Sequence, residues 1–244
     1  MFLWYYINMI RTGKKFSKPE MSRVINGDAV LPEEDVPLGM SYDEAVAEAS
    51  YQEIIRRYYE ALCQQRKGLS EGGPVHKLEI LMSQCNISTD DRKVVIAAKE
   101  RAEETNGPAA AIELDDGRII TGKTTSLLGA SSAMLLNALK ALAGIKKDVY
   151  LISPEVIEPI QELKIQHLGN NNPRLHTDEV LIALSVCAVT DPNARLALDQ
   201  LKKLFGCEMH SSVILSQVDE KLLKKLGINL TCEPAYQTKK LYHA

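Results

Sequence analysis

The sequence predicts an α/β protein in which a helical N-terminal region precedes a mixed sheet with helices on both faces. Three observations support this class. Apolar residues recur at helical spacing before the stop signal Gly107-Pro108, strand-like runs follow directly, and helical and strand-like segments then alternate to residue 232. Leaving out a helical pair at 177–205, the order from Thr89 is α-β-β-α-β-α-β-α-β.

Residues 1–40 are interpreted as an irregular lead segment. Its first 16 positions hold five of the 13 aromatic residues, and prolines and glycines interrupt any regular period after that. The capping-box pattern Ser41-Tyr-Asp-Glu44 then predicts a helix that runs to about Gln65. A glycine-rich loop separates it from a short helix near 78–85, and together these elements define a helical region over 41–88.

The α/β domain is expected over 89–234, with residues 235–244 as a tail. Two strand-like runs at 109–114 and 118–121 flank Asp115-Asp-Gly117, and Asp-Gly is among the strongest hairpin signals. The remaining segments are expected, in order, as a helix at 131–143, a strand at 149–152, a helix at 154–167, an inserted helical pair at 177–189 and 192–205, a strand at 209–215, a helix at 219–226 and a strand at 228–232.

Composition limits the classes of partner and compartment. Lys and Arg number 29 against 32 Asp and Glu, so no bulk positive charge attracts a nucleic acid. Five separated cysteines without a Cys-x-x-Cys pair indicate free thiols in a reducing cytoplasm. The apolar start has its basic residues after the apolar run and is too short to cross a bilayer, so neither a signal peptide nor a membrane partner is expected.

Residues 117–124 spell the phosphate-loop pattern G-x-x-x-x-G-K-[ST]. A phosphate loop needs a flexible turn whose N–H groups curl around an anion, whereas Arg-Ile-Ile-Thr between the glycines favours a strand. An extended chain would place the two glycines roughly 16 Å apart, at ~3.3 Å per residue. The segment is therefore predicted to be a hairpin without nucleotide binding.

A second candidate for anion binding lies where the following helix begins. Lys123 stands shortly before this start, and Ser131 and Ser132 supply hydroxyls beside uncapped N–H groups. The alternative is that either serine only caps the helix, because serine is a preferred cap in any protein.

Two histidines stand beside carboxylates and hydroxyls. His176 precedes Asp178 at an expected helix start, while Glu208 and His210 alternate along an expected strand, and the fold could bring the two groups together. A histidine beside an acid is typical of proton exchange near neutral pH. The structural alternative is that Asp178 interacts favourably with the helix dipole, and that Glu208 and His210 share a solvated face of their strand. Neither group has the spacing of a zinc ligand set, so no metal is expected.

Seven multi-residue blocks occur in order along the chain: QEIIRRYY at 52–59, GPAAAIEL at 107–114, LGASS at 128–132, LISPEVIEPI at 151–160, NPRLHTDEVL at 172–181, HSSVILSQ at 210–217 and LGINLTCEP at 226–234. Together these blocks resemble one uncharacterised bacterial family, the domain-of-unknown-function family 1846. The resemblance covers nearly everything from Asp43 to Pro234 and is to the C-terminal part of the family. It implies a truncated member that lacks the longer N-terminal half of its relatives and the glycine-rich segment found there.

The predicted element order also resembles the cytidine-deaminase-like architecture. In those enzymes, zinc motifs open the two helices that follow the second and third strands. The corresponding positions here read Ala130-Ser-Ser132 and Pro154-Glu155-Val-Ile157, without a thiolate or imidazole. The resemblance therefore implies two helix starts beside the sheet, with Glu155 at one of them, but no zinc-activated water.

The sequence leaves the function unknown, and three classes stay open. The chain is a structural, oligomerising or ligand-binding module for a missing N-terminal half, or an enzyme-like site for a small anionic or phosphorylated metabolite, or an inactive gene product. The catalytic candidates are His176, Asp178, Glu208 and His210, and the ligand-binding candidates are Lys123, Ser131, Ser132, Glu155, Arg174 and Ser211. No cofactor is expected, and the expected partners are a small anionic metabolite or further copies of the chain.

Overall fold

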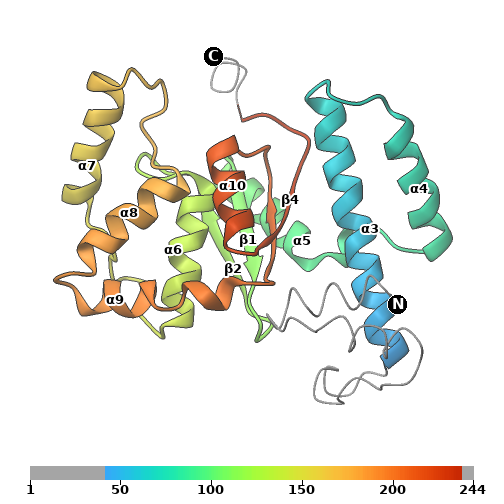
Figure 1. Cartoon of the computed structure of the whole chain (residues 1–244), viewed down its shortest axis with the longest axis horizontal. Helices are drawn as coiled ribbons and strands as arrows, with labels where there is room; N and C mark the ends of the chain where they lie inside the picture. The colour runs from blue at the N-terminus through green and yellow to red at the C-terminus, as the bar shows by residue number, and fades with distance from the viewer. Residues whose placement is uncertain (1–41, 238–244) are drawn as a thin grey trace, which may run out of the picture.

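The computed structural model describes residues 42–237 (Figure 1). Helices α3 (Tyr42–Arg66) and α4 (Gly73–Cys85) form the predicted helical region and lie together at one end of the molecule (Figure 1). Helix α4 begins before the expected 78–85 because Pro74 is favourable in a first helical turn. The lead segment 1–40, the Ser41 cap and the end of the predicted tail lie outside the described residues.

The sheet contains four described strands, β1 (Ala109–Glu113), β2 (Ile119–Lys123), β3 (Glu208–Ser211) and β4 (Asn229–Cys232), in the order β2-β1-β3-β4. Strand β1 is antiparallel to both neighbours, whereas β3 and β4 run parallel, so the sheet is mixed as predicted. Ala109 pairs with Lys123, and Gly117 turns the hairpin at a φ of 79°. The predicted hairpin at the phosphate-loop spelling is confirmed.

Helices cover both faces of the sheet, as predicted. Strand side chains alternate between faces, and Ala111 packs with Val94 and Ala98 at α5 (Lys93–Thr105). Its neighbour Ile112 points the other way, into the main core that contains much of α6 (Ala130–Leu142). The sheet therefore separates two environments, named here the α5 face and the α6 face.

Gly122, the second glycine of the phosphate-loop spelling, has a packing role instead. A Cβ atom added there would overlap the backbone of Ala133 and Met134 in α6. Only a residue without a side chain lets a helix approach a strand this closely. The glycine therefore sets the distance between β2 and α6.

The predicted strand at 149–152 is wrong. Leu151 and Ile152 are 4% exposed and pack into the main core, but they form a bend and join no strand. Just before this run, the Val149 carbonyl accepts a hydrogen bond from the Lys140 side chain of α6 at 3.2 Å. A short apolar run can be buried by packing alone, and periodicity does not distinguish that case from a strand.

The remaining helices gather mainly on the α6 face (Figure 1). They are α7 (Pro154–Glu162), which continues as a π-helical turn (Leu163–His167), α8 (Thr177–Cys187), α9 (Pro192–Leu198), a 3₁₀ turn (Leu201–Leu204) and α10 (Gln217–Lys225). Within 42–237, no helix has both the length and the apolar character that crossing a bilayer requires.

Candidate functional site

The two predicted histidine groups lie on opposite faces of the sheet. Met209 of β3 packs into the main core on the α6 face, so its neighbour His210 points to the α5 face. His176 precedes α8, and Leu175 beside it belongs to the main core. The two histidines therefore do not share a site, and each is considered with its own neighbours.

His176 forms a close pair with Asp219, a residue in the first turn of α10. Nδ1 of His176 lies 2.9 Å from Oδ2 of Asp219. The Asp219 side chain is 9% exposed, whereas the His176 side chain keeps 25% of its surface exposed. The side-chain contacts of the ring, with Asp219 and with Ser216, both involve Nδ1. One ring nitrogen is therefore held, while a quarter of the side-chain surface stays exposed.

The Asp219 carboxylate also joins the starts of α8 and α10. Its Oδ1 accepts hydrogen bonds from the Thr177 N–H at 2.8 Å and the Thr177 hydroxyl at 2.9 Å, and its Oδ2 accepts one from the Ser216 hydroxyl at 2.8 Å. In return, Ser216 Oγ accepts from the Asp219 N–H at 3.1 Å and caps α10. This network fixes the carboxylate before any ligand arrives.

The arrangement is not a Ser-His-Asp triad. In a triad the serine and the acid contact opposite ring nitrogens, but Ser216 Oγ lies 3.4 Å from Nδ1 of His176, the nitrogen that also faces Asp219. Ser216 therefore supports the acid and is not a nucleophile activated by Nε2. What remains is a histidine–aspartate pair that can exchange a proton at Nε2.

The pKa values of the pair shift in opposite directions. The hydrogen bond to Asp219 raises the pKa of His176, and this outweighs the burial that opposes it. Burial acts to raise the pKa of Asp219, but hydrogen bonds from His176, Thr177 and Ser216 outweigh burial and leave it lowered. Both shifts favour an imidazolium beside a carboxylate.

The predicted ligand residues are placed as follows. Lys123 is exposed at the end of β2, Ser131 and Ser132 are buried in the first turn of α6, Glu155 is exposed at the start of α7, Arg174 is half-buried just before α8, and Ser211 is buried in β3. Asp178 is half-buried in the first turn of α8, where its Oδ1 accepts from the Glu179 N–H at 2.9 Å.

Several of these polar groups hold the protein together. The Ser132 hydroxyl donates to the Leu175 carbonyl at 2.9 Å, and Arg174 Nε donates to the Thr125 carbonyl at 2.7 Å. The Ser211 hydroxyl donates to the carbonyl of Val213 at 2.8 Å. Each of these three side chains therefore has a hydrogen-bond partner within the chain.

At the start of α7, Glu155 is exposed and interacts with Ser153. Helix α7 reaches the segment before α6 through its last turn, where Gln161 donates to the Ser126 carbonyl at 3.0 Å. A hydrogen bond from the Ser153 side chain, at the N-cap position of α7, lowers the pKa of Glu155. Leu128 pairs with Leu175 in a parallel bridge, so that α6 and α8 begin side by side.

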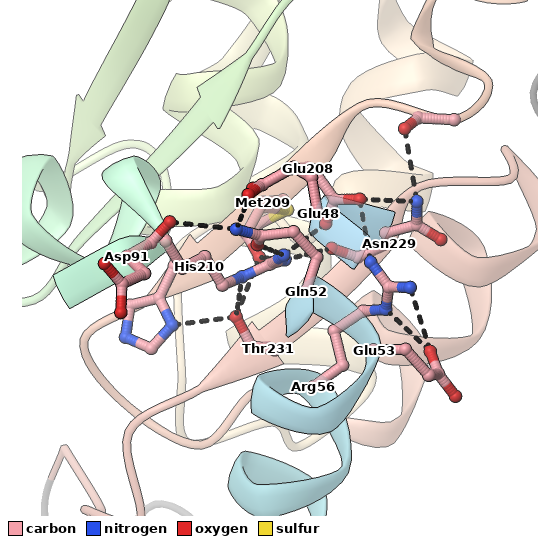
Figure 2. A network of polar contacts seen from close by, with 12 residues as sticks. Glu48, Gln52, Glu53, Arg56, Asp91, Glu208, Met209, His210, Asn229 and Thr231 are labelled. Carbon is pink, nitrogen blue, oxygen red and sulfur yellow. Dashed lines mark hydrogen bonds and ion pairs between the residues drawn. The ribbon is translucent and has the colours of Figure 1, made fainter. Parts of the chain in front are cut away.

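The α5 face holds a polar network that includes Glu208 and Thr231 (Figure 2). Its centre is Arg92, a residue that is 1% exposed. Its Nε donates to Thr231 Oγ1 at 3.1 Å, and one guanidinium nitrogen contacts Glu208. The other nitrogen donates to two backbone carbonyls, those of Met209 and Asn229. Every side of the guanidinium is used within the chain, so Glu208 acts as a structural partner here.

Arg56 connects this network to α3 (Figure 2). It donates to Glu208 at 2.9 Å and to Glu53 at 2.9 Å. Arg56 and Glu208 are 152 residues apart in the sequence, and their contact holds the helical region against β3.

His210 is fully buried beside the network. Its Nδ1 lies 2.9 Å from Thr231 Oγ1, and its Nε2 lies 3.3 Å from Glu233 Oε1 without the direction of a well-formed hydrogen bond. Burial lowers the pKa of His210 despite the Glu233 carboxylate. Tyr59 and Lys99 also contact that carboxylate, at 3.1 and 3.0 Å. With no exposed surface, His210 is inaccessible to a substrate.

Sequence reasoning missed Asp219 and Arg92. Ser216-Gln-Val-Asp219 has the spacing of a helix cap, which places an acid at a helix start but does not indicate a histidine partner 43 residues away. Arg92 stands in the charged run Asp90-Asp-Arg-Lys93, a pattern typical of a solvated surface.

In the described part of the chain, no three His, Cys, Asp or Glu side chains group as metal ligands would.

Comparison with known proteins places the chain in a family. Residues 90–242 match the family described as "Domain of unknown function DUF1846, C-terminal", and residues 33–86 match "Domain of unknown function DUF1846, N-terminal". The chain belongs to the DUF1846 family. The expectation of a match to the C-terminal part alone is wrong, because the N-terminal match covers the helical region of α3 and α4.

The curated relatives carry the name UPF0371 protein. One from Corynebacterium efficiens is 56% identical over 200 residues, which cover 82% of this chain and 40% of that protein. One from Streptococcus thermophilus is 49% identical over 207 residues, covering 85% of this chain and 42% of that protein. The chain spans about two fifths of the length of these relatives.

The observed order of helices and strands does not support the resemblance to the cytidine-deaminase-like architecture. It rested on five strands, and the third of them, at 149–152, does not form. The described part of this DUF1846 chain is a mixed α/β fold with four strands.

Proposed function

We propose that this chain supplies an acid–base histidine, His176, to a site for a small anionic metabolite. The observation that carries the proposal is the 2.9 Å contact between His176 Nδ1 and a nearly buried Asp219 carboxylate, with the imidazole still partly exposed. A histidine held at Nδ1 by a fixed acid has a defined tautomer and orientation. Both are requirements for efficient proton transfer.

The roles of the residues follow from this geometry. With Nδ1–H directed at Asp219, neutral His176 presents the lone pair of Nε2 and acts as a base. Once protonated, the same nitrogen presents an N–H and acts as an acid, and the Asp219 carboxylate stabilises the imidazolium. Thr177 and Ser216 keep the carboxylate in place through the hydrogen bonds described above.

Two features support an anionic ligand. The imidazolium form of His176 is itself a positive group, and its raised pKa extends the pH range in which it is charged. Helix α6 begins beside His176, and its N-cap Gly129 offers no side chain to the first-turn N–H groups. Such N–H groups and the helix dipole favour negative charge.

Histidine titration by NMR tests the proposal. We expect His176 to titrate above the usual histidine range, and we expect inorganic phosphate or phenyl phosphate to raise its pKa further and to shift its ring resonances in a saturable way. In Asp219→Asn the pKa of His176 should fall, because the principal hydrogen bond to the imidazolium is weakened.

His76 provides the matched control, since its side chain is 75% exposed on α4. Its resonances should not respond to phosphate, and His76→Gln should leave phosphate binding unchanged, whereas His176→Gln should weaken it. Phosphate that leaves the His176 resonances in place, or an unchanged His176 pKa in Asp219→Asn, would contradict the proposed acid–base site.

The structural alternative, an oligomerising module, is favoured by one observation. Ile182, Val186 and Val189 follow one face of α8 and its end, and they are 65%, 63% and 77% exposed. Because α8 also buries Val180 and Leu184, it is apolar on two sides, which is typical of a helix with a further packing partner. Sedimentation at about 100 µM tests self-association: a dimer that Val186→Lys converts to monomer supports it, and a monomeric parent chain rules it out.

A further inference from the structure

Strand β4 is an edge strand, and no other strand of the described residues pairs with it on the side away from β3. The Asn229 N–H donates to Cys207 O and the Glu233 N–H donates to Ser211 O, both on the β3 side. Because backbone groups of a strand alternate between its two sides, Leu230 and Cys232 direct theirs outward. Cys63 of α3 donates to the Cys232 carbonyl at 3.3 Å, but no group within 42–237 bonds the N–H or the carbonyl of Leu230.

This edge opens into a cavity of about 290 Å³ between β4, α3 and α10. Leu230 and Cys232 line it on the strand side, and Ile214, Leu215 and Ile228 add an apolar floor. The volume lies near the lower limit of small-molecule pockets. An unpaired strand edge beside a hollow is the arrangement that binds extended peptides by strand addition.

The α3 wall carries charges of both signs. Glu53 is paired with Arg56 and Arg57, which lie in the same helix. Glu60, by contrast, is exposed and has no ion pair among the described residues. Two turns further on, Lys67 has one ion pair with the described residues, a 3.7 Å contact with Glu220. A carboxylate without an ion pair and an ammonium group with one long ion pair therefore occur along the α3 wall, and Glu220 and Lys224 of α10 also line the cavity.

Their spacing indicates the size of a ligand. Seven residues separate Glu60 from Lys67, which corresponds to roughly 10 Å along a helix at ~1.5 Å per residue. An extended tripeptide spans about the same length, at ~3.4 Å per residue. Its ammonium end would lie near Glu60, its carboxylate near Lys67, and its central amide near Leu230.

From this match of length, charge and hydrogen-bonding groups, we infer that the cavity between α3 and β4 binds a short zwitterionic peptide of small residues. The peptide pairs with the Leu230 backbone, and its two charged ends are met by Glu60 and Lys67. This site is separate from the His176–Asp219 pair, so either proposal can fail without the other.

Amide NMR with tri-alanine as the probe tests the inference on the full chain. We expect a saturable downfield shift of the Leu230 N–H and slower hydrogen exchange at that amide when the peptide is bound. N-acetyl-tri-alanine amide, which lacks both charges, should bind at least about fivefold more weakly, the effect expected for two exposed charge contacts.

Gln64 lies between Glu60 and Lys67 on α3 and lines the cavity, whereas the neighbouring Gln65 is exposed and does not. Gln64→Trp should fill the cavity and abolish binding, and Gln65→Trp should bind as the parent chain does. Glu60→Gln, an exposed and isosteric change, should weaken tri-alanine binding about two- to fivefold.

Three results would overturn the inference. The first is a Leu230 N–H that tri-alanine never shifts, and the second is binding that survives Gln64→Trp in a chain that retains its fold. The third is slow exchange of the Leu230 N–H in the free chain, which would mean that another segment of the protein already occupies the edge.

Discussion

The two faces of the sheet each contain a histidine next to a carboxylate, yet they differ in what the histidine can do. On the α6 face, the His176 side chain is 25% exposed and is bound at one nitrogen only. On the α5 face, His210 is fully buried between Thr231 and Glu233. The comparison teaches that a histidine–acid pair indicates chemistry only when one ring nitrogen stays accessible.

The two acids differ in the same way. Asp219 joins two helix starts and positions a partly exposed ring, whereas Glu208 neutralises two arginines that hold α3 and β4 against β3. The α5-face network therefore serves stability first, whereas the α6-face pair is the one for which we propose a ligand. Variants on the two faces should separate these roles.

Arg92→Leu should have the largest effect on stability. It leaves Glu208 with one fewer cation and removes the donors to Thr231 and to two backbone carbonyls. Breaking a buried ion pair from one side costs about 3–5 kcal/mol, and urea unfolding should show a loss of that order.

Arg57→Ala is the control for this variant, because the Arg57 side chain is 61% exposed in its pair with Glu53. It should cost less than about 1 kcal/mol. Equal losses in the two variants would mean that the buried network is not the main source of stability on the α5 face.

Asp219→Asn should have the next largest effect and should change both stability and titration. Losing charge-assisted hydrogen bonds from Thr177 and Ser216 should cost about 2–3 kcal/mol in unfolding free energy. The same variant should lower the pKa of His176, a change that Arg92→Leu should not produce. Asp178→Asn, one residue from Thr177, is the control and should leave the His176 pKa unchanged.

The pH dependence of stability should differ in sign between the two histidines, with effects smaller than those above. The raised pKa of His176 gives stability that is complete below the unfolded value of about 6.5 and is lost as pH rises through the folded pKa. His210 has a lowered pKa, so the folded state disfavours its charged form and loses stability as pH falls from about 6.5 through the folded pKa.

Unfolding midpoints between pH 5 and pH 9 would measure both slopes. His176→Gln should remove the decline above neutral pH, and His210→Gln should remove the decline below it. Glu233 and Tyr59 face His210, and the cations Lys99 and Arg92 lie near it, so the acid slope should survive every change confined to the α6 face. If His176→Gln and His210→Gln both removed the same decline in stability, the assignment of one histidine to each face would be contradicted.

Much of the fold could be predicted from local sequence. The Asp-Gly hairpin between β1 and β2 and the helices of the helical region and α6 follow from signals within a few residues, such as turn chemistry and apolar spacing. The expected strand at 149–152 failed because burial of Leu151 and Ile152 against a helix produces the same apolar run as a strand does.

The sequence by itself determined the α/β class, the hairpin and the choice of His176 as a residue that begins a helix beside acids. Only the tertiary structure decided that Asp219, 43 residues away, is its partner, that His210 lies on the other face, and that Arg92 is buried. The reason is physical: turns and helix caps depend on neighbours along the chain, whereas the exposure of an imidazole depends on which distant elements pack against it.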